Sequence, residues 1–302
     1  MANFAMLGAA GFVAPRHMKA IHDVGGQLVA ACDPYDGVGV LDRYFPSCRF
    51  FTEVERFDRH LEKQRRDPNG VSVDFMSICS PNYLHDAHCR LALRLNTTPI
   101  CEKPLVISPW NLDQLEQLET EYESKVKTVL QLRLHSEAQR LKSALAADKG
   151  RKRSVELIYV TRRGSWYHQS WKGTEEKSGG LIMNIGIHFF DLLLWLFGPP
   201  VGATVTARSG SRIKGRLELE RADVNWLLSV DIDDLPGGHL EAGKHAHRAL
   251  TTGDDRFDFS TGFDDLHTRV YRQILAGEGY GIEDARPSIE LVHRLRTLPL
   301  ST

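Results

Sequence analysis

Short apolar runs alternate with amphipathic stretches along the first part of the chain. The continuous apolar runs are Phe4–Leu7, Gln27–Cys32, Val73–Cys79, Thr98–Cys101 and Val126–Leu130. Helix-like patterns lie between them at about Pro15–Val24, Asn82–Leu95 and Leu112–Tyr122. Continuous runs separated by helices indicate strands that are buried on both faces of a parallel sheet. We therefore expect a doubly wound α/β domain over residues 1–131.

The pattern changes after about residue 150, where strand-like segments follow one another with few helices between them. These segments are Val155–Thr161, Val201–Arg208, Arg212–Leu219 and Asp223–Asp231. Helices are expected at Ile185–Phe197, Phe263–Ala276 and Ile282–Leu298. This order favours an α+β domain with a mainly antiparallel open sheet over residues 132–302. The Gly-rich and His-rich stretch Asp233–His247 is expected to be a mobile loop.

Composition narrows the class of protein. The 302 residues are 42% hydrophobic and 25% charged, and the formal net charge of −1 gives no general attraction to nucleic acid. No continuous apolar run spans a membrane, and the first residues lack the basic segment of a secretory signal. The five cysteines form no CxxC pair, which favours reduced thiols and a cytoplasmic protein.

A glycine turn, Gly8-Ala-Ala-Gly11-Phe12-Val13, follows the first expected strand and precedes the first helix. Small residues in that position let the backbone approach a pyrophosphate, and a helix N-terminus supplies free amides. The GxxGxxA spacing differs from GxGxxG, so a plain turn that needs small residues is an alternative. Asp33 ends the second strand, where an acid accepts hydrogen bonds from a ribose and repels a 2′-phosphate. If Asp33 is not simply a turn residue, it favours NAD over NADP.

Ser80-Pro81-Asn82 follows the next strand and is expected to cap a helix whose amides face a cofactor. The alternative is a cap and nothing more. His85 and His88 share one face of that helix, but no further ligands accompany them, so we expect no metal.

Glu102-Lys103-Pro104 follows the strand that ends at Cys101, at the sheet edge where open α/β proteins bind ligands. A lysine beside a positively charged nicotinamide would have a lowered pKa and could polarise a substrate hydroxyl. Pro104 could adopt the cis form. A surface Glu–Lys pair is the alternative.

Asn184 and His188 lie four residues apart at the start of an apolar helix. Both can therefore point the same way. A histidine has a pKa near neutrality and can accept a proton, although a histidine on an apolar helix is often a core residue. Asp191 is expected to orient His188, cap the helix or join the domains through a salt bridge.

Together these motifs resemble the Gfo/Idh/MocA oxidoreductases over nearly the whole chain. Longer runs, including residues 163–173, 228–236 and 279–286, are most similar to the bacterial UDP-N-acetyl-2-amino-2-deoxyglucuronate dehydrogenases of lipopolysaccharide O-antigen synthesis. The resemblance implies an NAD-binding Rossmann domain and a domain for substrate binding and oligomerisation. It implies oxidation of the 3-hydroxyl of UDP-N-acetylglucosaminuronate (UDP-GlcNAcA) to a ketone, with possible recycling of NADH by 2-oxoglutarate.

The resemblance also implies roles for particular residues. His188 would accept the proton, Lys103 would stabilise the alkoxide, and Asn184 would orient the hydroxyl or His188. The expected cofactor contacts come from the first domain: Gly8, Gly11, Phe12, Val13, Asp33, Ser80, Asn82, His85, Glu102, Lys103 and Gln131. The expected substrate contacts come from the second: Arg163, Trp166, Tyr167, Lys172, Asn184 and His188. A homo-oligomer, a dimer or a tetramer, is expected.

Two alternatives stay open at this stage. Another sugar or cyclitol dehydrogenase of the same family would keep the catalytic residues and differ around residues 163–172. A catalytically silent NAD-binding regulator would be expected to lack the lysine or the histidine, and both Lys103 and His188 are present.

Overall fold

The computed structural model describes residues 1–147, 152–253, 255–259, 262–263 and 265–301. The chain divides into two compact units. Unit 1 comprises residues 1–131 and 264–285, and unit 2 comprises residues 132–263 and 286–302. These units differ from the predicted domains in residues 264–285, which the sequence assigns to the second domain.

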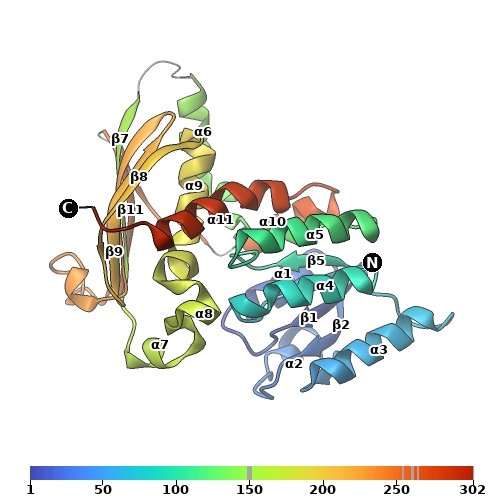
Figure 1. Cartoon of the computed structure of the whole chain (residues 1–302). Coiled ribbons are helices and arrows are strands. Elements are labelled where there is room, and N and C mark those ends of the chain that lie inside the picture. Colours follow the sequence, from blue (N-terminus) through green and yellow to red (C-terminus); the bar gives the residue numbers. More distant parts are fainter. Residues whose placement is uncertain (148–151, 254, 260–261, 264, 302) are drawn as a thin grey trace. The chain divides into compact units, whose positions relative to one another are not determined.

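Unit 1 contains a six-stranded sheet in which every neighbouring pair of strands is parallel. Its strands are β1 (Asn3–Leu7), β2 (Gln27–Cys32), β3 (Arg49–Phe51), β4 (Phe75–Ile78), β5 (Thr98–Cys101) and β6 (Lys127–Thr128). The spatial order is β3-β2-β1-β4-β5-β6, so the direction of winding reverses between β1 and β4. β1, β2 and β5 are labelled in Figure 1. The parallel, doubly wound sheet is confirmed. β3 was missed because it has only three residues and no long apolar run.

The helices of unit 1 flank this sheet. They are α1 (Ala14–Asp23), α2 (Leu41–Tyr44), α3 (Val54–Arg66), the 3₁₀ turn η1 (Asn82–Leu84), α4 (His85–Arg94), α5 (Pro109–Glu121) and α10 (Leu266–Leu275). α1 and α5 each carry a proline in their first turn, where no intrahelical N–H is needed. α3 buries only Phe57 and Leu61, which explains why its pattern gave no prediction.

Unit 2 contains a second sheet of six strands, in the order β12-β11-β7-β10-β9-β8. These are β7 (Arg153–Thr161), β8 (Pro200–Arg208), β9 (Arg212–Leu219), β10 (Ala222–Ser229), β11 (Ala246–Thr252) and β12 (Asp255–Asp258). Only β7 and β10 pair in parallel, which confirms a mainly antiparallel sheet. Exposed and buried residues alternate strictly along β9, so one face of that strand packs inward.

The helical segments of unit 2 are mostly short. They are η2 (Gln131–Leu134, whose first residue belongs to unit 1), α6 (Ser136–Ala147), α7 (Ser165–Gln169), η3 (Trp171–Gly173), α8 (Glu175–Ser178), the π-helix η4 (Ile182–Gly186) and α9 (Ile187–Phe197). α11 (Ile282–Thr297) begins in unit 1 and continues into unit 2. Gly186 allows close packing on β10, since a Cβ there would lie 2.5 Å from Leu228 Cδ1.

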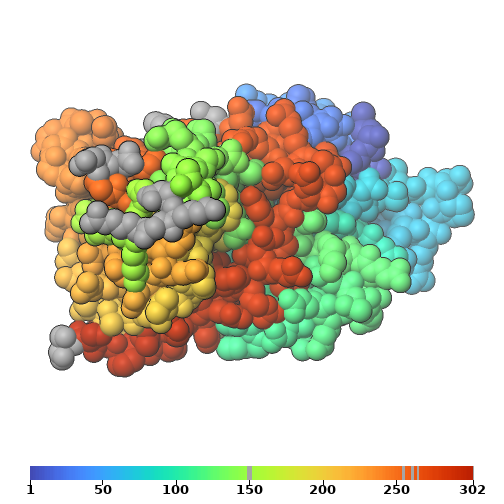
Figure 2. Space-filling view, turned by 90° about the horizontal axis from the view of Figure 1, so that it is seen from above, coloured from blue at the N-terminus to red at the C-terminus, as the bar shows by residue number. Residues whose placement is uncertain are grey.

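The expected loop between β10 and β11 begins with the 3₁₀ turn η5 (Ile232–Asp234). β11 begins at Ala246, so the last two residues of the predicted loop, Ala246 and His247, belong to a strand instead. The segment, drawn in orange, forms a rounded projection of unit 2 (Figure 1 and Figure 2). Its mobility stays a prediction.

One segment corrects the expectation about membrane-spanning runs. Glu175–Phe197 is long and apolar enough to cross a membrane by length and composition. It was missed because polar residues such as Asn184 and Asp191 interrupt its apolar run. However, 67% of its most apolar window is buried inside the protein, which is typical of a core helix.

Candidate active site

The glycine turn lies at the point where the strand order of unit 1 reverses. Gly8 has a φ of +84°, and a Cβ there would lie 2.5 Å from the backbone of Cys79 and Ser80. A Cβ on Gly11 would lie 3.0 Å from Gly8 O. The turns after β1 and β4 therefore approach too closely for larger side chains. Beyond them, Phe12 is 86% exposed and Val13 precedes the first turn of α1.

Asp33 connects this turn to the end of β2. Its Oδ2 accepts a hydrogen bond from the Ala10 amide at 3.0 Å, and its Oδ1 accepts one from the Tyr35 amide at 2.9 Å. Each carboxylate oxygen has a second lone pair, so Asp33 still has capacity to accept hydroxyl donors. The geometry fits the predicted ribose contact, which the sequence alone could not separate from a turn role.

His85 bonds within the protein through both ring nitrogens, and the cofactor contact predicted for it stays a prediction. The ring is buried, with Nδ1 2.7 Å from Pro104 O and Nε2 2.8 Å from Ser80 O. Burial lowers the pKa of His85, which favours a neutral ring that donates to one of these carbonyl oxygens. His85 thus ties the turn after β4 to the turn after β5. Asn82, at the start of η1, is also buried.

Ser80 is engaged through its side chain as well. Its Oγ lies 2.8 Å from His88 Nδ1, so the second histidine of the predicted helix face also bonds within the protein. Burial, followed by the proximity of a second imidazole, His85, lowers the pKa of His88 to about 4. These contacts give both histidines partners other than a metal ion.

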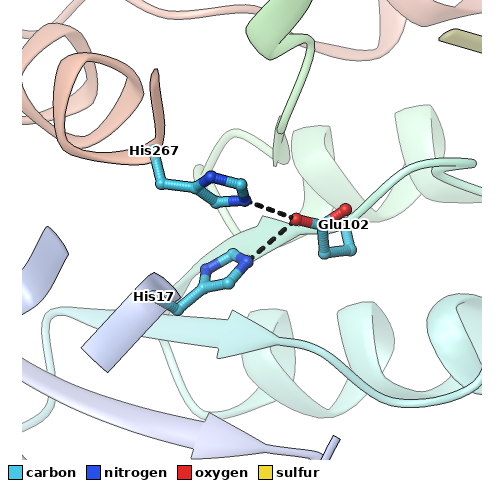
Figure 3. A group of neighbouring side chains, drawn as sticks. All are labelled: His17, Glu102 and His267. Carbon is cyan, nitrogen blue, oxygen red and sulfur yellow. Dashed lines mark hydrogen bonds and ion pairs between the residues drawn. The ribbon is translucent and has the colours of Figure 1, made fainter. Parts of the chain in front are cut away.

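The alternative of a surface Glu–Lys pair is wrong for Glu102, which is 5% exposed. Its Oε1 accepts hydrogen bonds from His17 Nε2 at 2.9 Å and His267 Nε2 at 3.0 Å (Figure 3). Its Oε2 accepts one from the Lys103 amide at 3.2 Å. The Lys103–Pro104 peptide bond is cis. Sequence reasoning missed His17 and His267, because nothing local marks residues 250 positions apart as neighbours.

The residues present in unit 1 fit a dinucleotide. The close approach at Gly8 leaves a cradle without side chains, and Asp33 provides an acceptor beside it. Gln131, just beyond β6, is 6% exposed, and its buried Oε1 has no hydrogen-bond partner among the residues that the structure describes. An orphaned buried acceptor is costly unless a ligand or water satisfies it, so Gln131 also suits a polar ligand.

In unit 2, Asn184 lies in the π-helix that leads directly into α9. Its Nδ2 donates a hydrogen bond to the Tyr167 hydroxyl at 3.1 Å. π-turns are rare and frequently occur at functional sites, which adds support to the predicted site. His188, in the first turn of α9, is partly exposed, whereas Asn184 is buried.

Tyr167 corrects one part of the substrate prediction. Its ring is 2% exposed, so it cannot serve as an open stacking surface for uracil or a sugar. Burial raises the pKa of the Tyr167 hydroxyl, which stays protonated and holds Asn184. Tyr167 therefore contacts Asn184 in the interior, whereas the ring of Trp166 is 52% exposed and is open to solvent.

Cations and aromatic rings gather around η3, as predicted. Lys172 Nζ lies 4.4 Å from the centroid of the Trp171 ring and 6.0 Å from that of Trp166. Burial, followed by the nearby charge of Arg163, lowers the pKa of Lys172. Two neighbouring cations beside exposed indole provide the chemistry needed to bind an anionic group attached to a planar ring.

Asp191 does form a salt bridge, and its partner is Arg133 in the same unit. Arg133 Nε lies 3.0 Å from Asp191 Oδ2, and Arg133 Nη2 lies 2.7 Å from Oδ1. Both residues belong to unit 2, so the pair is not the interdomain bridge considered as one alternative.

Comparison with known proteins places the chain in a family. A profile described as "Oxidoreductase family, NAD-binding Rossmann fold" matches residues 2–130, and one for the GFO/IDH/MocA C-terminal domain matches residues 138–253. Two structures of the WlbA (WbpB) dehydrogenase from Thermus thermophilus have 49% identity and cover 100% of this chain and 97% of theirs. Their TM-scores are 0.96, with NAD and α-ketoglutarate, and 0.95, with NAD and UDP-GlcNAcA.

Curated relatives are more distant. The putative oxidoreductase YteT of Bacillus subtilis (strain 168) is 29% identical over 54% of this chain and 40% of its own length. The D-glucoside 3-dehydrogenase of Escherichia coli (strain K12) is 29% identical over 47% of this chain and 41% of its own length. The chain therefore spans less than half the length of these two relatives. From the two matching profiles and the full-length similarity, the chain belongs to the Gfo/Idh/MocA family of oxidoreductases, and residues 2–130 form its NAD-binding Rossmann domain.

Proposed function

We propose that this chain is an NAD-dependent dehydrogenase that oxidises the 3-hydroxyl of UDP-GlcNAcA to a 3-keto group. The observation that carries the proposal is the 49% identity, over the full chain, to a dehydrogenase whose structure contains NAD and UDP-GlcNAcA. The cation and indole cluster of unit 2 supports the same substrate class, since a nucleotide sugar uronate offers a pyrophosphate, a carboxylate and a planar base.

The chemistry requires the sugar to lose a hydride from C3 and a proton from the 3-hydroxyl. NAD, when bound, supplies the acceptor for the hydride. In the proposed mechanism His188 takes the hydroxyl proton, because its imidazole changes charge near neutral pH. Lys103 stabilises the negative charge that develops on the oxygen. Asn184, held by Tyr167, orients the hydroxyl or the His188 ring.

The substrate contacts are assigned to unit 2. Arg163 and Lys172 would bind the acidic groups of the nucleotide sugar, and Trp166 would stack on its uracil or sugar. The lowered pKa of Lys172 supports this assignment, because two crowded cations gain from a bound anion.

Recycling of the cofactor by 2-oxoglutarate is part of the proposal. The Thermus dehydrogenase also has a structure with NAD and α-ketoglutarate. 2-Oxoglutarate carries carboxylates, as the uronate does, so the same cations could bind it. Hydride transfer to its keto carbon, with protonation of the oxygen, gives 2-hydroxyglutarate and restores NAD⁺.

We also infer a setting for the reaction. The 3-keto product is the substrate that a transaminase needs to install a 3-amino group, which suits O-antigen sugar synthesis. All five cysteines are free, which is compatible with a reducing cytoplasm. A homodimer or homotetramer without nucleic-acid or membrane partners is expected, and light scattering of the purified protein measures its mass.

A second candidate is the oxidation of another sugar by the same chemistry. The 29% identity to a D-glucoside 3-dehydrogenase favours a 3-hydroxyl as the reacting group even when the nucleotide is absent. A panel that includes D-glucosides, inositol and UDP-glucuronate tests it. A non-catalytic regulator is disfavoured, because Lys103 and His188 are both retained.

The test is a turnover assay with UDP-GlcNAcA, run with and without 2-oxoglutarate, with the keto sugar followed by mass spectrometry. Continuous product formation that requires 2-oxoglutarate supports both oxidation and recycling. NADH accumulation without any effect of 2-oxoglutarate supports oxidation and removes recycling. Absence of product with UDP-GlcNAcA, together with turnover of a D-glucoside, replaces the proposed substrate.

A further inference from the structure

A buried carboxylate lies one residue before the proposed catalytic lysine. Glu102 follows β5 and is 5% exposed, and burial of an unpaired carboxylate is strongly unfavourable. Its environment must therefore supply hydrogen-bond donors. Two imidazoles donate to Oε1 (Figure 3), and the Lys103 amide donates to Oε2.

The donors come from elements far apart in the sequence. His17 belongs to α1, and His267 belongs to α10, which packs against α1 within unit 1. The two rings meet edge to face, with centroids 4.9 Å apart. Thr268 strengthens the contact by donating to Asp23 Oδ2 at 2.9 Å. Residues 265–275 thus complete the environment of a loop that precedes them by more than 160 positions.

A chain of hydroxyl groups fixes the tautomer of His17. Its Nδ1 lies 2.7 Å from the Tyr271 hydroxyl, and that hydroxyl lies 2.6 Å from Ser77 Oγ. Since His17 Nε2 donates to Glu102, a neutral ring must accept at Nδ1, so Tyr271 donates to His17 and Ser77 donates to Tyr271. Burial lowers the pKa of His17 and raises that of Tyr271 well above its usual value, which keeps both neutral.

The carboxylate remains charged in this network. Burial opposes the charged form of Glu102, but the hydrogen bonds from His17 and His267 outweigh it and hold the pKa of Glu102 well below its usual range. One full negative charge is therefore fixed beside Lys103, and each of its oxygens points at a defined donor.

Two imidazoles and a carboxylate are also ligand types of zinc. However, the two Nε2 atoms lie 2.9 Å and 3.0 Å from the same oxygen and are directed at it (Figure 3). Metal ligation would require unprotonated nitrogens directed at an ion. In addition, Tyr271 occupies the other nitrogen of His17. The contacts therefore favour a hydrogen-bonded cluster.

The backbone on the C-terminal side of Lys103 is also held by a hydrogen bond. Pro104 O lies 2.7 Å from His85 Nδ1, so the groups on both sides of Lys103 bond to buried residues. We propose that Glu102 is a positioning residue, held by His17 and His267, that fixes the backbone of Lys103 so that its ammonium can stabilise the charge that develops on the substrate oxygen. This role differs from the cofactor contact predicted for Glu102, and its catalytic part rests on the proposed function.

Glu102→Gln tests this role because it replaces one of the two acceptor oxygens by a hydrogen-bond donor. The two imidazole donors retain the amide oxygen of the glutamine, so its NH₂ group turns toward the Lys103 amide, and donor faces donor. We expect kcat to fall about 10- to 100-fold, because small misplacements of catalytic groups have effects of that size. The Kd of NAD should change less than about threefold.

Glu119→Gln is the matched control. Glu119 is another buried glutamate of unit 1, and its Oε1 accepts a hydrogen bond from the Val126 amide at 2.6 Å. Its substitution should lower stability without lowering kcat. If Glu102→Gln fails to fold, Tyr271→Phe removes only the hydroxyl that fixes the His17 tautomer, and it should lower kcat with unchanged NAD affinity.

The decisive catalytic test is whether the effect of Glu102→Gln on turnover depends on the presence of Lys103. In a Lys103→Ala background, Glu102→Gln should change the residual turnover less than about threefold, because the group that it positions is gone. Equal losses in both backgrounds overturn the proposal. Weakened NAD binding with unchanged kcat overturns it in favour of a cofactor ligand, and stoichiometric metal that is lost in Glu102→Gln overturns it in favour of a metal site.

Amide exchange of Lys103, measured by NMR, needs no substrate. The Lys103 amide should be protected in the wild type and should exchange at least about tenfold faster in Glu102→Gln, whereas Glu119→Gln leaves it unchanged. If UDP-GlcNAcA is not turned over but this exchange pattern is found, the proposed function fails and the positioning contact stands. Equal exchange in all three proteins overturns the contact itself.

Discussion

Arg133 and Asp191 form a bidentate ion pair in the core of unit 2, with N–O distances of 3.0 Å and 2.7 Å. Both side chains are almost fully buried. Asp191 lies on α9, three residues after His188, so the pair fixes the helix that carries the proposed base. Removing one partner takes the bidentate ion pair away from the other buried charge, and breaking a buried pair in this way costs about 3–5 kcal/mol.

We therefore expect Asp191→Asn and Arg133→Met each to lower the free energy of unfolding by about 3–5 kcal/mol in urea titrations. The double variant Arg133→Met/Asp191→Leu should lose less than either single variant, because it leaves no buried charge. Arg140→Gln is the control, since its ion pair with Glu137 is exposed and should contribute less than about 1 kcal/mol. Single-variant losses as small as that of the control would contradict this account.

The glycine turn gives a second prediction, from two glycines that share a positive φ. Gly8 has a φ of +84° and Gly25 has one of +72°, but a Cβ meets backbone at 2.5 Å only at Gly8. Gly25→Ala should cost about 1–2 kcal/mol of unfolding free energy, the usual cost of a left-handed conformation. Gly8→Ala should cost more and weaken NAD binding in calorimetry. Equal effects would mean that close approach does not explain Gly8.

Asp33 predicts the choice of cofactor. Removing its negative charge in Asp33→Asn should shift the ratio of the Kd values for NAD and NADP toward NADP by about tenfold or more. The ratio is the useful readout, because the variant also disturbs the amide contacts of Ala10 or Tyr35 and weakens both ligands. Asp36→Asn removes an exposed charge nearby and should leave the ratio unchanged. An unaltered ratio in Asp33→Asn would remove Asp33 from cofactor selection.

Acid should destabilise unit 1 from about pH 6.5 downward. The pKa values of His17, His85 and His88 are lowered by burial, and that of His88 falls to about 4. Below pH 6.5 the unfolded chain binds protons that the folded chain does not, so stability falls with pH by up to about 1.4 kcal/mol per unit for each histidine. Glu102, whose folded pKa is depressed, adds to the loss below its unfolded value of 4.5.

Denaturant titrations between pH 7 and pH 4 measure this dependence. His88→Gln should flatten the slope in that range, because its folded pKa lies near the lower limit. Gln114→Ala, at an exposed and uncharged position of α5, provides the control and should keep the wild-type slope. A slope that His88→Gln leaves unchanged would mean that His88 is not held neutral by the fold.

Much of the fold could be predicted from the sequence, because periodicity reports burial directly. The strands at Gln27–Cys32, Thr98–Cys101 and Arg212–Leu219 were predicted with their observed bounds. β3 and β12 were missed because short edge strands carry little apolar pattern. β11 was missed as well, because Ala246–Thr252 shows no regular alternation of apolar and polar residues. Local motifs also marked Gly8 and Lys103, since turn and strand-end chemistry depends on neighbours in the chain.

Contacts between distant segments could not be predicted in this way. The sequence predicts Glu102 as a cofactor contact, with a surface residue beside a lysine as the alternative, and only the fold places His17 and His267 on its carboxylate. Tyr167 reads as a stacking residue, because no sequence signal reveals that its hydroxyl meets Asn184 in the interior. In each case the residue type indicated that the side chain can form hydrogen bonds. Only the tertiary fold determines which partner it bonds to.

The most direct test of the central claim is a single turnover with UDP-GlcNAcA that carries deuterium at C3 of the sugar. The account predicts that the label passes to the nicotinamide, that the sugar product is two mass units lighter than unlabelled substrate, and that the rate shows a primary isotope effect. A product that retains deuterium at C3, or a nicotinamide that gains none, would contradict oxidation at that carbon.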